Sequence, residues 1–228
     1  RLEILGSTFR HEFKDGFPAI TTKKLFYKNV VTELIWFLRG DTNIKYLLDN
    51  GCNIWNKDAY KHYLKLCKEY IVEDPYTINE FVDLIKSGKG MGGYSCGDLG
   101  PVYGHQWRNF GGVDQISKLI NGLRYKPMST EHIVNSWNVG QLDDMALPPC
   151  HYVFQVLVKP LSRAEMILHG TAPIDEDTNR VMFEKSTKYG FELHWDQRSV
   201  DVFLGLPYNI ASYATLAKKI EKLTGYKA

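Results

Sequence analysis

One stretch near the middle of the chain restricts most strongly what this sequence can fold into. Pro148 and Pro149 stand directly before Cys150 and His151, and the apolar, strand-like run Tyr152–Val158 follows them. A short apolar run of this kind is typical of a buried strand. The stretch therefore places one cysteine directly before the start of a buried strand, where its thiolate could attack an electrophilic carbon.

Length and composition indicate a folded protein with a sizeable core. The chain has 228 residues, of which 44% are hydrophobic and 13% aromatic, and this excludes a disordered protein and fits a single domain. The net charge of +2 gives no general reason to expect nucleic acid or a membrane as partner. No apolar run approaches the roughly 18 residues that span a bilayer, and we expect no signal peptide before the first strand.

The cysteines indicate a reducing compartment. They are Cys52, Cys67, Cys96 and Cys150, and their spacing shows neither a CxxC motif nor a paired framework. We therefore expect reduced thiols and a cytoplasmic location.

Hydrophobic periodicity predicts helices mainly in the first half of the chain and strands mainly in the second. Helices are expected to begin at or near Asn29, Asp58, Thr77, Asp114 and Asn209. Strands are expected at Leu2–Leu5, His132–Val134, Tyr152–Val158, Phe191–His194 and Ser199–Phe203. This order favours the α+β fold class.

Local signals mark where several of these elements start and stop. Thr77, with Glu80 three residues later, forms a capping box, and Asn29 is placed to cap the helix that follows it. Asp15–Pro18 reads as a turn, and the glycine-rich tract Ser87–Gly93 reads as a mobile loop.

Six strings of residues, none of low complexity, follow one another along the chain. They are Phe17–Lys24, Glu33–Asn43, Gly97–Arg108, Ser136–Asp143, Pro148–Val158 and Gln197–Tyr213. In sequence and in order they resemble the thymidylate synthase family. The resemblance covers Leu2–Ser212, apart from two poorly matching stretches at about Asp58–Cys96 and Lys159–Asp196.

The resemblance implies a fold and a domain organisation. The family's fold is a twisted mixed sheet with helices packed on one face, and the other face meets the second subunit of a homodimer. Residues 1–228 would form a single catalytic domain with an insertion at about residues 58–96. Compared with the family, we expect the chain to be incomplete at both ends, without an N-terminal phosphate-binding arginine and without a C-terminal segment that binds the sugar.

The resemblance also implies the reaction. Thymidylate synthases convert dUMP to dTMP by reductive methylation, with 5,10-methylenetetrahydrofolate as cosubstrate, dihydrofolate as product and no metal. A thiolate adds to C6 of uracil, which makes C5 nucleophilic toward the one-carbon unit of the folate. Loss of the C5 proton and hydride transfer from the folate then complete the methyl group.

Catalytic roles fall, by resemblance, on residues that also stand out chemically. Cys150 is the nucleophile, although a lone cysteine is more often buried and inert, so its reactivity requires a nearby cation such as Arg198. Glu33 interrupts an apolar helical face, where an unpaired carboxylate is unfavourable, and this indicates a role in proton transfer. Tyr103 and His151 join the same network by resemblance.

The resemblance assigns further residues to ligands. Asn138 joins the catalytic set by helping to hold the nucleotide and the active-site network. The dUMP set comprises Arg198, Ser199, Gln197, Asn209 and Asp201. The folate set comprises Trp55, Asp201, Gly205 and Lys23.

Several of these assignments compete with simpler structural roles. Asn209 could cap a helix, but its amide also offers the donor and the acceptor that O4 and N3–H of uracil require, and we favour base recognition. Asp201 could cap or pair instead of bonding the pterin ring, and Arg198 could form a surface salt bridge. Trp55 could be only a hydrophobic anchor, whereas by resemblance it shields the reactive methylene from water.

Two positions depart from the family pattern. Thr130 and Glu131 stand where the family has an adjacent arginine pair, donated across the dimer to the substrate phosphate. A glutamate facing a phosphate would repel it. We therefore expect weak dUMP binding or a compensating cation, with Arg124 and Lys126 as the nearest candidates.

Two other functions stay open at this point. A pyrimidine nucleotide hydroxymethylase of the same superfamily would let water rather than hydride capture the methylene, and Trp55 argues against it. A non-enzymatic remnant that binds nucleotide, forms dimers or binds RNA is the second alternative. The absence of a basic run gives RNA binding little support.

Overall fold

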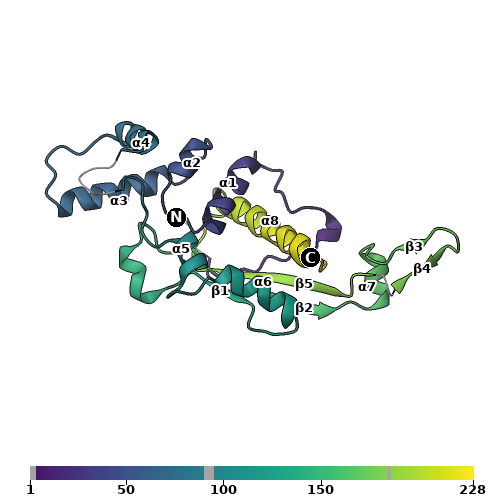
Figure 1. The fold of residues 1–228 in the computed structure, drawn as a ribbon. Coiled ribbons are helices and arrows are strands. Elements are labelled where there is room, and N and C mark those ends of the chain that lie inside the picture. The colour runs from purple at the N-terminus through teal and green to yellow at the C-terminus, as the bar shows by residue number, and fades with distance from the viewer. Residues whose placement is uncertain (1–3, 90–94, 184–185) are drawn as a thin grey trace.

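In a computed structural model, which describes residues 4–89, 95–183 and 186–228, most of the α-helices lie in the first half of the chain (Figure 1). The α-helices are α1 (Tyr27–Leu38), α2 (Lys45–Asp49), α3 (Asn56–Glu69), α4 (Ile78–Ser87), α5 (Tyr103–Asn109), α6 (Gln115–Tyr125), α7 (Arg163–Leu168) and α8 (Leu206–Thr224). The short 3-10 helices are η1 (Phe13–Asp15) and η2 (Val139–Asp144). In the described part of the chain, no helix is both long and apolar enough to cross a membrane.

The strands lie in the second half of the chain. They are β1 (Ile133–Asn135), β2 (His151–Pro160), β3 (Ile174–Asp175), β4 (Arg180–Val181) and β5 (Tyr189–Gln197). One sheet has the order β1-β2-β5, and β3 and β4 form a separate two-stranded sheet. The α+β class is confirmed, and the sheet differs from the expected mixed sheet in that each named pair of strands is antiparallel.

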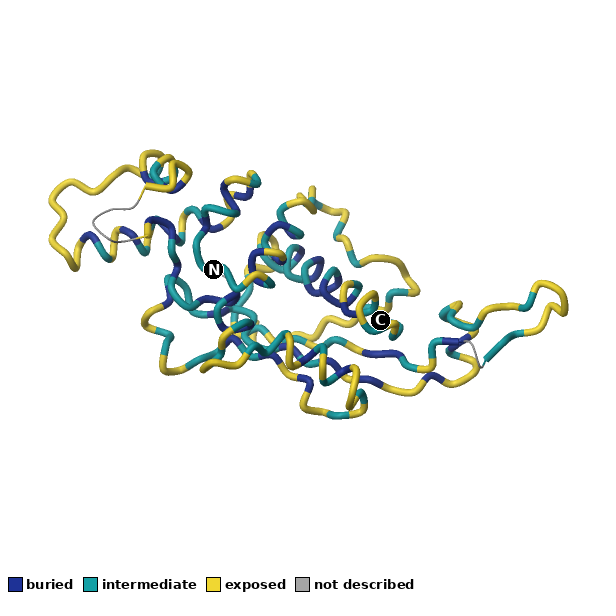
Figure 2. Tube along the Cα trace, viewed as in Figure 1, coloured by how far each residue is buried: buried dark blue, intermediate teal, exposed yellow. Residues whose placement is uncertain are grey.

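Helices cover one face of the three-stranded sheet. Phe154, Val156 and Val158 alternate along β2 on the covered face and are buried, whereas Leu157 between them is 40% exposed. Figure 1 shows α8 running along this sheet, and α8 packs in turn against α1 and α6. Figure 2 shows buried segments recurring along α1, α8 and the strands. The prediction of helices on one face is confirmed.

Two expected boundaries near the C-terminus are wrong. α8 begins at Leu206, with Pro207 in its first turn, so Asn209 lies inside the helix rather than at its N-cap. Ser199–Phe203 is not a strand. The carboxylate of Asp201 accepts hydrogen bonds from two backbone N–H groups that follow it, and this local bonding turns the chain.

Two expectations near the N-terminus also fail. α1 begins at Tyr27, so Asn29 lies in its first turn and does not cap it, although Gly40 follows its end at a φ of 74°, as expected of a helix stop. The described part of the expected strand Leu2–Leu5 is not a strand, and Ile4 is 88% exposed. These residues are apolar, but no described strand pairs with them.

Other predicted boundaries are confirmed. Thr77 and Glu80 form the capping box of α4, and the carboxylate of Asp114 accepts a backbone N–H at the start of α6. Gly16 has a φ of 100° in the predicted turn. Of the predicted loop Ser87–Gly93, the first residue ends α4, and residues 90–93 lie outside the described residues.

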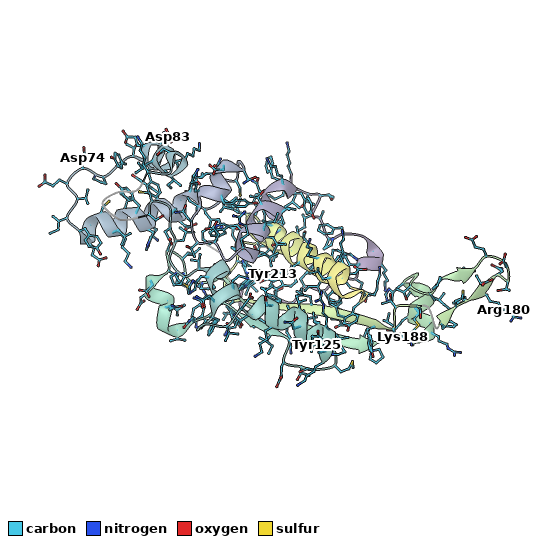
Figure 3. The ribbon with its side chains drawn as sticks, in the orientation of Figure 1. Asp74, Asp83, Tyr125, Arg180, Lys188 and Tyr213 are labelled. Carbon is cyan, nitrogen blue, oxygen red and sulfur yellow. The ribbon has the colours of Figure 1, made fainter. Side chains whose placement is uncertain are left out.

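The two stretches that match the family poorly form local structures of their own. In the first, α3 and α4 pack through the rings of Tyr63 and Phe81, which stack with centroids 4.6 Å apart. In the second, the described residues between β2 and β5 form an arm that carries α7 and the β3–β4 hairpin. Figure 3 shows Arg180 at the far end of this arm, well away from the rest of the chain.

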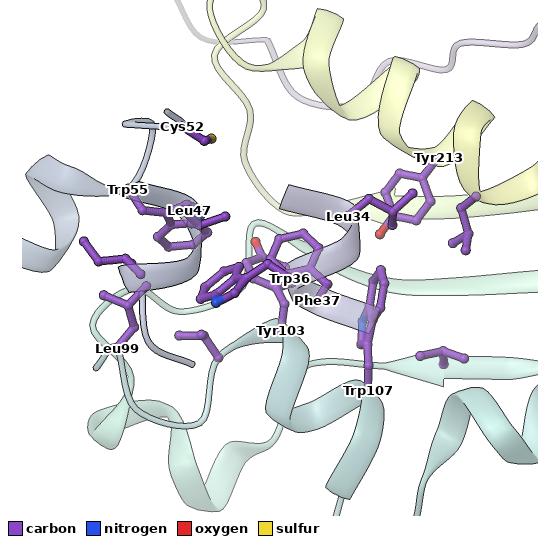
Figure 4. Packing of buried hydrophobic residues seen from close by; sticks show 14 of the residues in the cluster. Leu34, Trp36, Phe37, Leu47, Cys52, Trp55, Leu99, Tyr103, Trp107 and Tyr213 are labelled. Atoms are coloured by element: carbon purple, nitrogen blue, oxygen red, sulfur yellow. The ribbon is translucent and has the colours of Figure 1, made fainter. Parts of the chain in front are cut away.

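An aromatic cluster joins α1 to α5 and positions the residues described next. Figure 4 shows Trp36 and Phe37 of α1 beside Tyr103 and Trp107 of α5, and each of the four is at most 2% exposed. The ring centroid of Phe37 lies 4.8 Å from that of Tyr103 and 5.4 Å from that of Trp107. Such ring contacts contribute beyond their buried area, so the start of α5 is held firmly against α1.

Candidate active site

The pairing of β2 with β5 brings the expected nucleophile and its expected cation together. His151 at the start of β2 pairs with Gln197 at the end of β5. The backbone N–H of Arg198 donates to the carbonyl of Cys150 at 2.9 Å. Its guanidinium donates to the carbonyls of the two prolines before the cysteine, each at 2.9 Å. Arg198 therefore fixes the loop that carries Cys150.

The thiol of Cys150 is half-buried and is not activated in this state. Burial raises its pKa, the positive charge of Arg198 lowers it, and the negative charge of Asp58 raises it. The expected cation is present, but burial outweighs it, so the thiol keeps its proton at neutral pH. Asp58 was missed by sequence reasoning because it looks like any acidic residue in a first helical turn.

Tyr103 contacts the backbone of the cysteine loop. Its hydroxyl oxygen accepts a 2.7 Å hydrogen bond from the backbone N–H of Cys150. Burial, followed by the charges of Cys150, Tyr213 and Glu33, raises the pKa of Tyr103 well above its usual value. Tyr103 is therefore a protonated phenol whose own proton stays available for donation.

His151 is held as a neutral imidazole between two tyrosines. Its ring stacks on Tyr103, with centroids 4.3 Å apart and 20° between the planes, and its Nδ1 lies 2.8 Å from the hydroxyl oxygen of Tyr213. Burial lowers the pKa of His151 to about 3. Sequence reasoning missed Tyr213, since an aromatic residue on a helix signals only core packing.

Glu33 and Trp55 form a direct hydrogen bond. The indole N–H of Trp55 donates to Oε1 of Glu33 at 2.7 Å, and the indole ring meets Tyr103 edge-on at 6.1 Å. Burial raises the pKa of Glu33 to about 7, although the bond from Trp55 lowers it. Glu33 is therefore divided between its protonated and ionised forms near neutral pH, as a proton-transfer group requires.

Replacing Glu33 by glutamine is expected to stabilise the protein above neutral pH and to change its stability little near pH 4.5. The native state holds a proton that the unfolded chain releases at its usual pKa of 4.5, so wild-type stability falls as pH rises from there to about 7. Glutamine keeps the acceptor for Trp55 and removes this loss, which is about 3 kcal/mol. Urea unfolding at both ends of this range measures the difference. Equal differences at low and high pH would contradict the raised pKa.

Asn138 belongs to a network of amide side chains. Its Nδ2 donates to Oε1 of Gln106 at 3.2 Å and to Oε1 of Gln141 at 3.0 Å. Nε2 of Gln106 donates in turn to Oε1 of Gln141 at 2.8 Å, and Gln106 is fully buried. The network fixes the orientation of the Asn138 amide. Gln106 and Gln141 were missed because their role depends on contacts between distant parts of the chain.

Gln197 carries a buried polar atom without a partner. Its Nε2 is buried and forms no hydrogen bond within the part of the chain that the structure describes. Leaving such an atom unsatisfied costs about 1–3 kcal/mol, so a ligand with an acceptor at this point is a physical explanation for it. Ser199 follows two residues later and is half-buried.

Three expected folate residues gather before and at the start of α8. Oδ1 of Asp201 accepts from the N–H of Phe203 at 2.9 Å, and the Asp201 carbonyl accepts from the N–H of Gly205 at 2.9 Å. Lys23 Nζ donates to the carbonyl of Phe203 at 2.9 Å and lies 4.9 Å from the centre of its ring. Asp201 therefore caps the turn before α8, which is the structural role given above as the alternative to binding the pterin ring. Trp55 lies apart from this group, beside Glu33.

Thr130 and Glu131 lie beside the open face of the sheet. Gln155, which alternates with the buried residues of β2, donates to the carbonyl of Thr130 at 2.7 Å. Glu131 lines a groove of about 570 Å³ together with residues of α6, and Lys126 lines the same groove. Both departures from the family pattern are exposed, so their side chains are open to another molecule.

Known proteins match this chain over nearly its whole length. A family model described as thymidylate synthase matches residues 1–228. The thymidylate synthase of Mesoplasma florum is 42% identical over 223 residues, covering 98% of this chain and 66% of that protein. The one of Mycoplasma genitalium is 41% identical over 226 residues, covering 99% of this chain and 67% of that protein.

A solved structure matches as well. The crystal structure of thymidylate synthase from T4 phage superposes with a TM-score of 0.64 at 36% identity, covering 94% of this chain and 59% of that chain. The fold and these matches place the chain in the α+β class. The chain belongs to the thymidylate synthase family. It spans about two thirds of the length of the curated relatives that it matches.

Proposed function

We propose that the protein converts dUMP to dTMP by reductive methylation, with 5,10-methylenetetrahydrofolate as cosubstrate and dihydrofolate as second product. One observation carries this proposal, namely the set of groups around a single cysteine. Arg198 fixes the loop of Cys150, Tyr103 bonds its N–H, and His151 stacks on that tyrosine. A nucleophile beside proton-transfer groups is what addition to uracil and proton removal from its C5 require.

Cys150 acts as the nucleophile in this proposal. Its sulfur forms a bond to C6 of uracil as the electrons of the C5–C6 double bond shift toward C5 and O4. Because burial disfavours the thiolate, the positive charge of Arg198 is needed to form it. The bond between sulfur and C6 breaks at the end, and the thiolate is regenerated.

Proton transfers are assigned to Glu33, Tyr103 and His151. Glu33, with a pKa of about 7, can both give and take a proton near neutral pH. Tyr103 remains a phenol and is assigned to orienting, through its hydroxyl group, the water molecule that takes the C5 proton. His151 is neutral, so one of its ring nitrogens donates and the other accepts.

The nucleotide is assigned to five residues and to one amide of the network. The unpartnered Nε2 of Gln197 supports a ligand acceptor at that point. Asn209 lies within the first turn of α8 rather than at its N-cap, which supports assigning its amide to the base edge. Asn138 is oriented by its bonds to two glutamines. Arg198 and Ser199 are assigned to the phosphate of the nucleotide. Asp201 is assigned to the nucleotide site through the loop before α8 that its carboxylate stabilises.

The folate is assigned to Trp55, Asp201, Gly205 and Lys23. Trp55 is fixed beside Glu33 by its 2.7 Å hydrogen bond, which supports a role in excluding water. Both hydrogen bonds of the Asp201 carboxylate within the described residues use Oδ1, so Oδ2 is assigned to accept from the pterin ring. A Cβ at Gly205 would lie 3.3 Å from the Asp201 carbonyl oxygen, so a side chain there would crowd this loop. When bound, the folate supplies the one-carbon unit and the hydride.

A homodimer through the open face of the sheet is part of the proposal. Ile133 and Leu157 are 48% and 40% exposed on the side turned away from the helices, and exposed apolar residues of this kind are typical of an interface. Among the described residues, Cys52, Cys67 and Cys150 are free thiols, which supports a reducing compartment such as the cytoplasm.

Spectroscopic detection of dihydrofolate tests the proposed reaction. Purified protein with dUMP and methylene-folate is expected to form dihydrofolate in proportion to dTMP. Hydroxymethyl-dUMP formed without dihydrofolate would replace the proposal by a hydroxymethylase. Binding of dUMP with neither product would instead support the non-enzymatic remnant.

Replacing Asn209 by aspartate is expected to lower dUMP turnover and to raise the relative use of dCMP. The amino group of cytosine donates where O4 of uracil accepts, so a carboxylate suits it better. One exchanged hydrogen bond should shift the ratio of the two kcat/KM values by about tenfold. Asn121→Asp is the matched control, because Asn121 is an exposed residue of α6 and the substitution is chemically the same. An unchanged ratio would show that Asn209 does not read the base.

A further inference from the structure

We propose that Tyr213 is a positioning residue that holds His151 in one tautomer, with the ring proton on Nε2. The inference deepens the proposed function, because it states which nitrogen of His151 can donate during the reaction. It rests on a 2.8 Å hydrogen bond between the Tyr213 hydroxyl and Nδ1, and on the packing that fixes both rings.

Tyr213 is held rigidly by aromatic neighbours on the covered face of the sheet. Trp195 of β5 stacks on it with centroids 4.9 Å apart and 13° between the planes. Phe154 of β2 meets it edge-on at 5.8 Å, and the residue is 4% exposed. The hydroxyl group is therefore directed by packing, and its place does not depend on the bond to His151.

The direction of the hydrogen bond follows from what surrounds the Tyr213 hydroxyl. Burial, followed by the charge of Glu33, raises the pKa of Tyr213, so the group keeps its proton. Within the described residues, His151 Nδ1 is the one partner of this hydroxyl. A buried hydroxyl with a single partner donates to it when that partner can accept. Nδ1 of neutral His151 then accepts, and the ring proton resides on Nε2.

The histidine ring cannot easily exchange its two nitrogens by turning over. Tyr103 stacks on one side of it at 4.3 Å, and Phe37 lies at 6.1 Å. A flipped ring would lose the bond to Tyr213 while remaining buried. The pair therefore presents Nε2–H as a fixed donor for the uracil carbonyl or for a water molecule bound to it.

Nitrogen-15 NMR of histidine-labelled, ligand-free protein tests the tautomer directly. In the wild type, the signals of His151, assigned by their loss in His151→Gln, should show a protonated Nε2 and an unprotonated Nδ1. In Tyr213→Phe, which keeps the ring and its stacking, the two signals should move toward average values. A wild-type spectrum with the proton on Nδ1 would overturn the proposal, whatever the activity of the protein.

Kinetics then test the consequence for catalysis. Tyr213→Phe is expected to lower kcat about tenfold with little change in KM, because only a donor orientation is lost. Tyr27→Phe is the matched control, since Tyr27 also hydrogen-bonds α8, through Thr215 at 3.0 Å, and lies outside the site. An unchanged kcat in Tyr213→Phe, or an equal loss in Tyr27→Phe, would refute a positioning role. Failure of the proposed reaction itself would appear as no turnover in the wild type, with the NMR result unaffected.

Discussion

Replacing Cys150 by alanine is expected to abolish the covalent capture of 5-fluoro-dUMP in the presence of methylene-folate. It should also reduce dTMP formation by roughly 10⁴-fold or more, because alanine removes the group assigned to form the bond to C6. With fluorine at C5 there is no proton to remove, so the product of addition stays attached to sulfur. Mass spectrometry of the intact protein measures the adduct.

The other cysteines supply the control for this experiment. Cys52, Cys67 and Cys96 are buried, whereas Cys150 is only partly so. Cys67→Ala, on α3, should therefore keep full capture. An adduct on Cys150→Ala protein with unchanged thermal unfolding would show that the nucleophile is another residue, and the assignment of the reaction would fall with it.

The fold class could be predicted because the sequence signals agree with one another over most of the chain. β2 and β5 follow from apolar runs, and Thr77 and Asp114 mark helix starts by their own side chains. Ser199–Phe203 misled the prediction, because polar and apolar residues that alternate predict a strand, yet Val202 is 70% exposed. There the local bonds of Asp201 prevail over the apolar pattern.

The candidate site could be predicted only as far as the resemblance reaches. It indicated Cys150 and Arg198, and the structure brings them together. The balance between burial and charge at the thiol could not be read from sequence, since it depends on how much of the group the fold covers. Tyr213 and Gln106 were missed for the same reason, because their partners lie in distant segments.

Introducing arginine at both Thr130 and Glu131 is expected to tighten dUMP binding by about two to four orders of magnitude. Each charge-assisted contact to phosphate contributes roughly 1.5–3 kcal/mol, and the present pair supplies no cation. Thr130 is exposed beside Gln155 on the open face of the sheet, so an arginine at this position could contact the phosphate bound by the second subunit of a dimer. Isothermal titration calorimetry with dUMP measures the change.

Two controls separate phosphate recognition from a general effect of charge. Deoxyuridine lacks the phosphate, so its binding should remain nearly unchanged in the double variant. Ile174→Arg with Glu176→Arg adds the same positive charge on the β3–β4 arm, beyond the end of the β2–β5 pair and away from β1 (Figure 1), and should leave dUMP affinity close to that of the wild type.

The wild-type protein decides whether a compensating cation already exists. Lys126 lines the same groove as Glu131. Arg124 lies two residues before Lys126, in the last turn of α6. If either serves the phosphate, wild-type affinity should be micromolar or better, and Arg124→Ala with Lys126→Ala should weaken it about tenfold to a hundredfold. Micromolar dUMP binding that persists in the Arg124→Ala, Lys126→Ala variant would mean that other residues bind the phosphate. In that case dUMP binding is not weakened by the absence of arginines at positions 130 and 131, and Arg124 and Lys126 do not replace them.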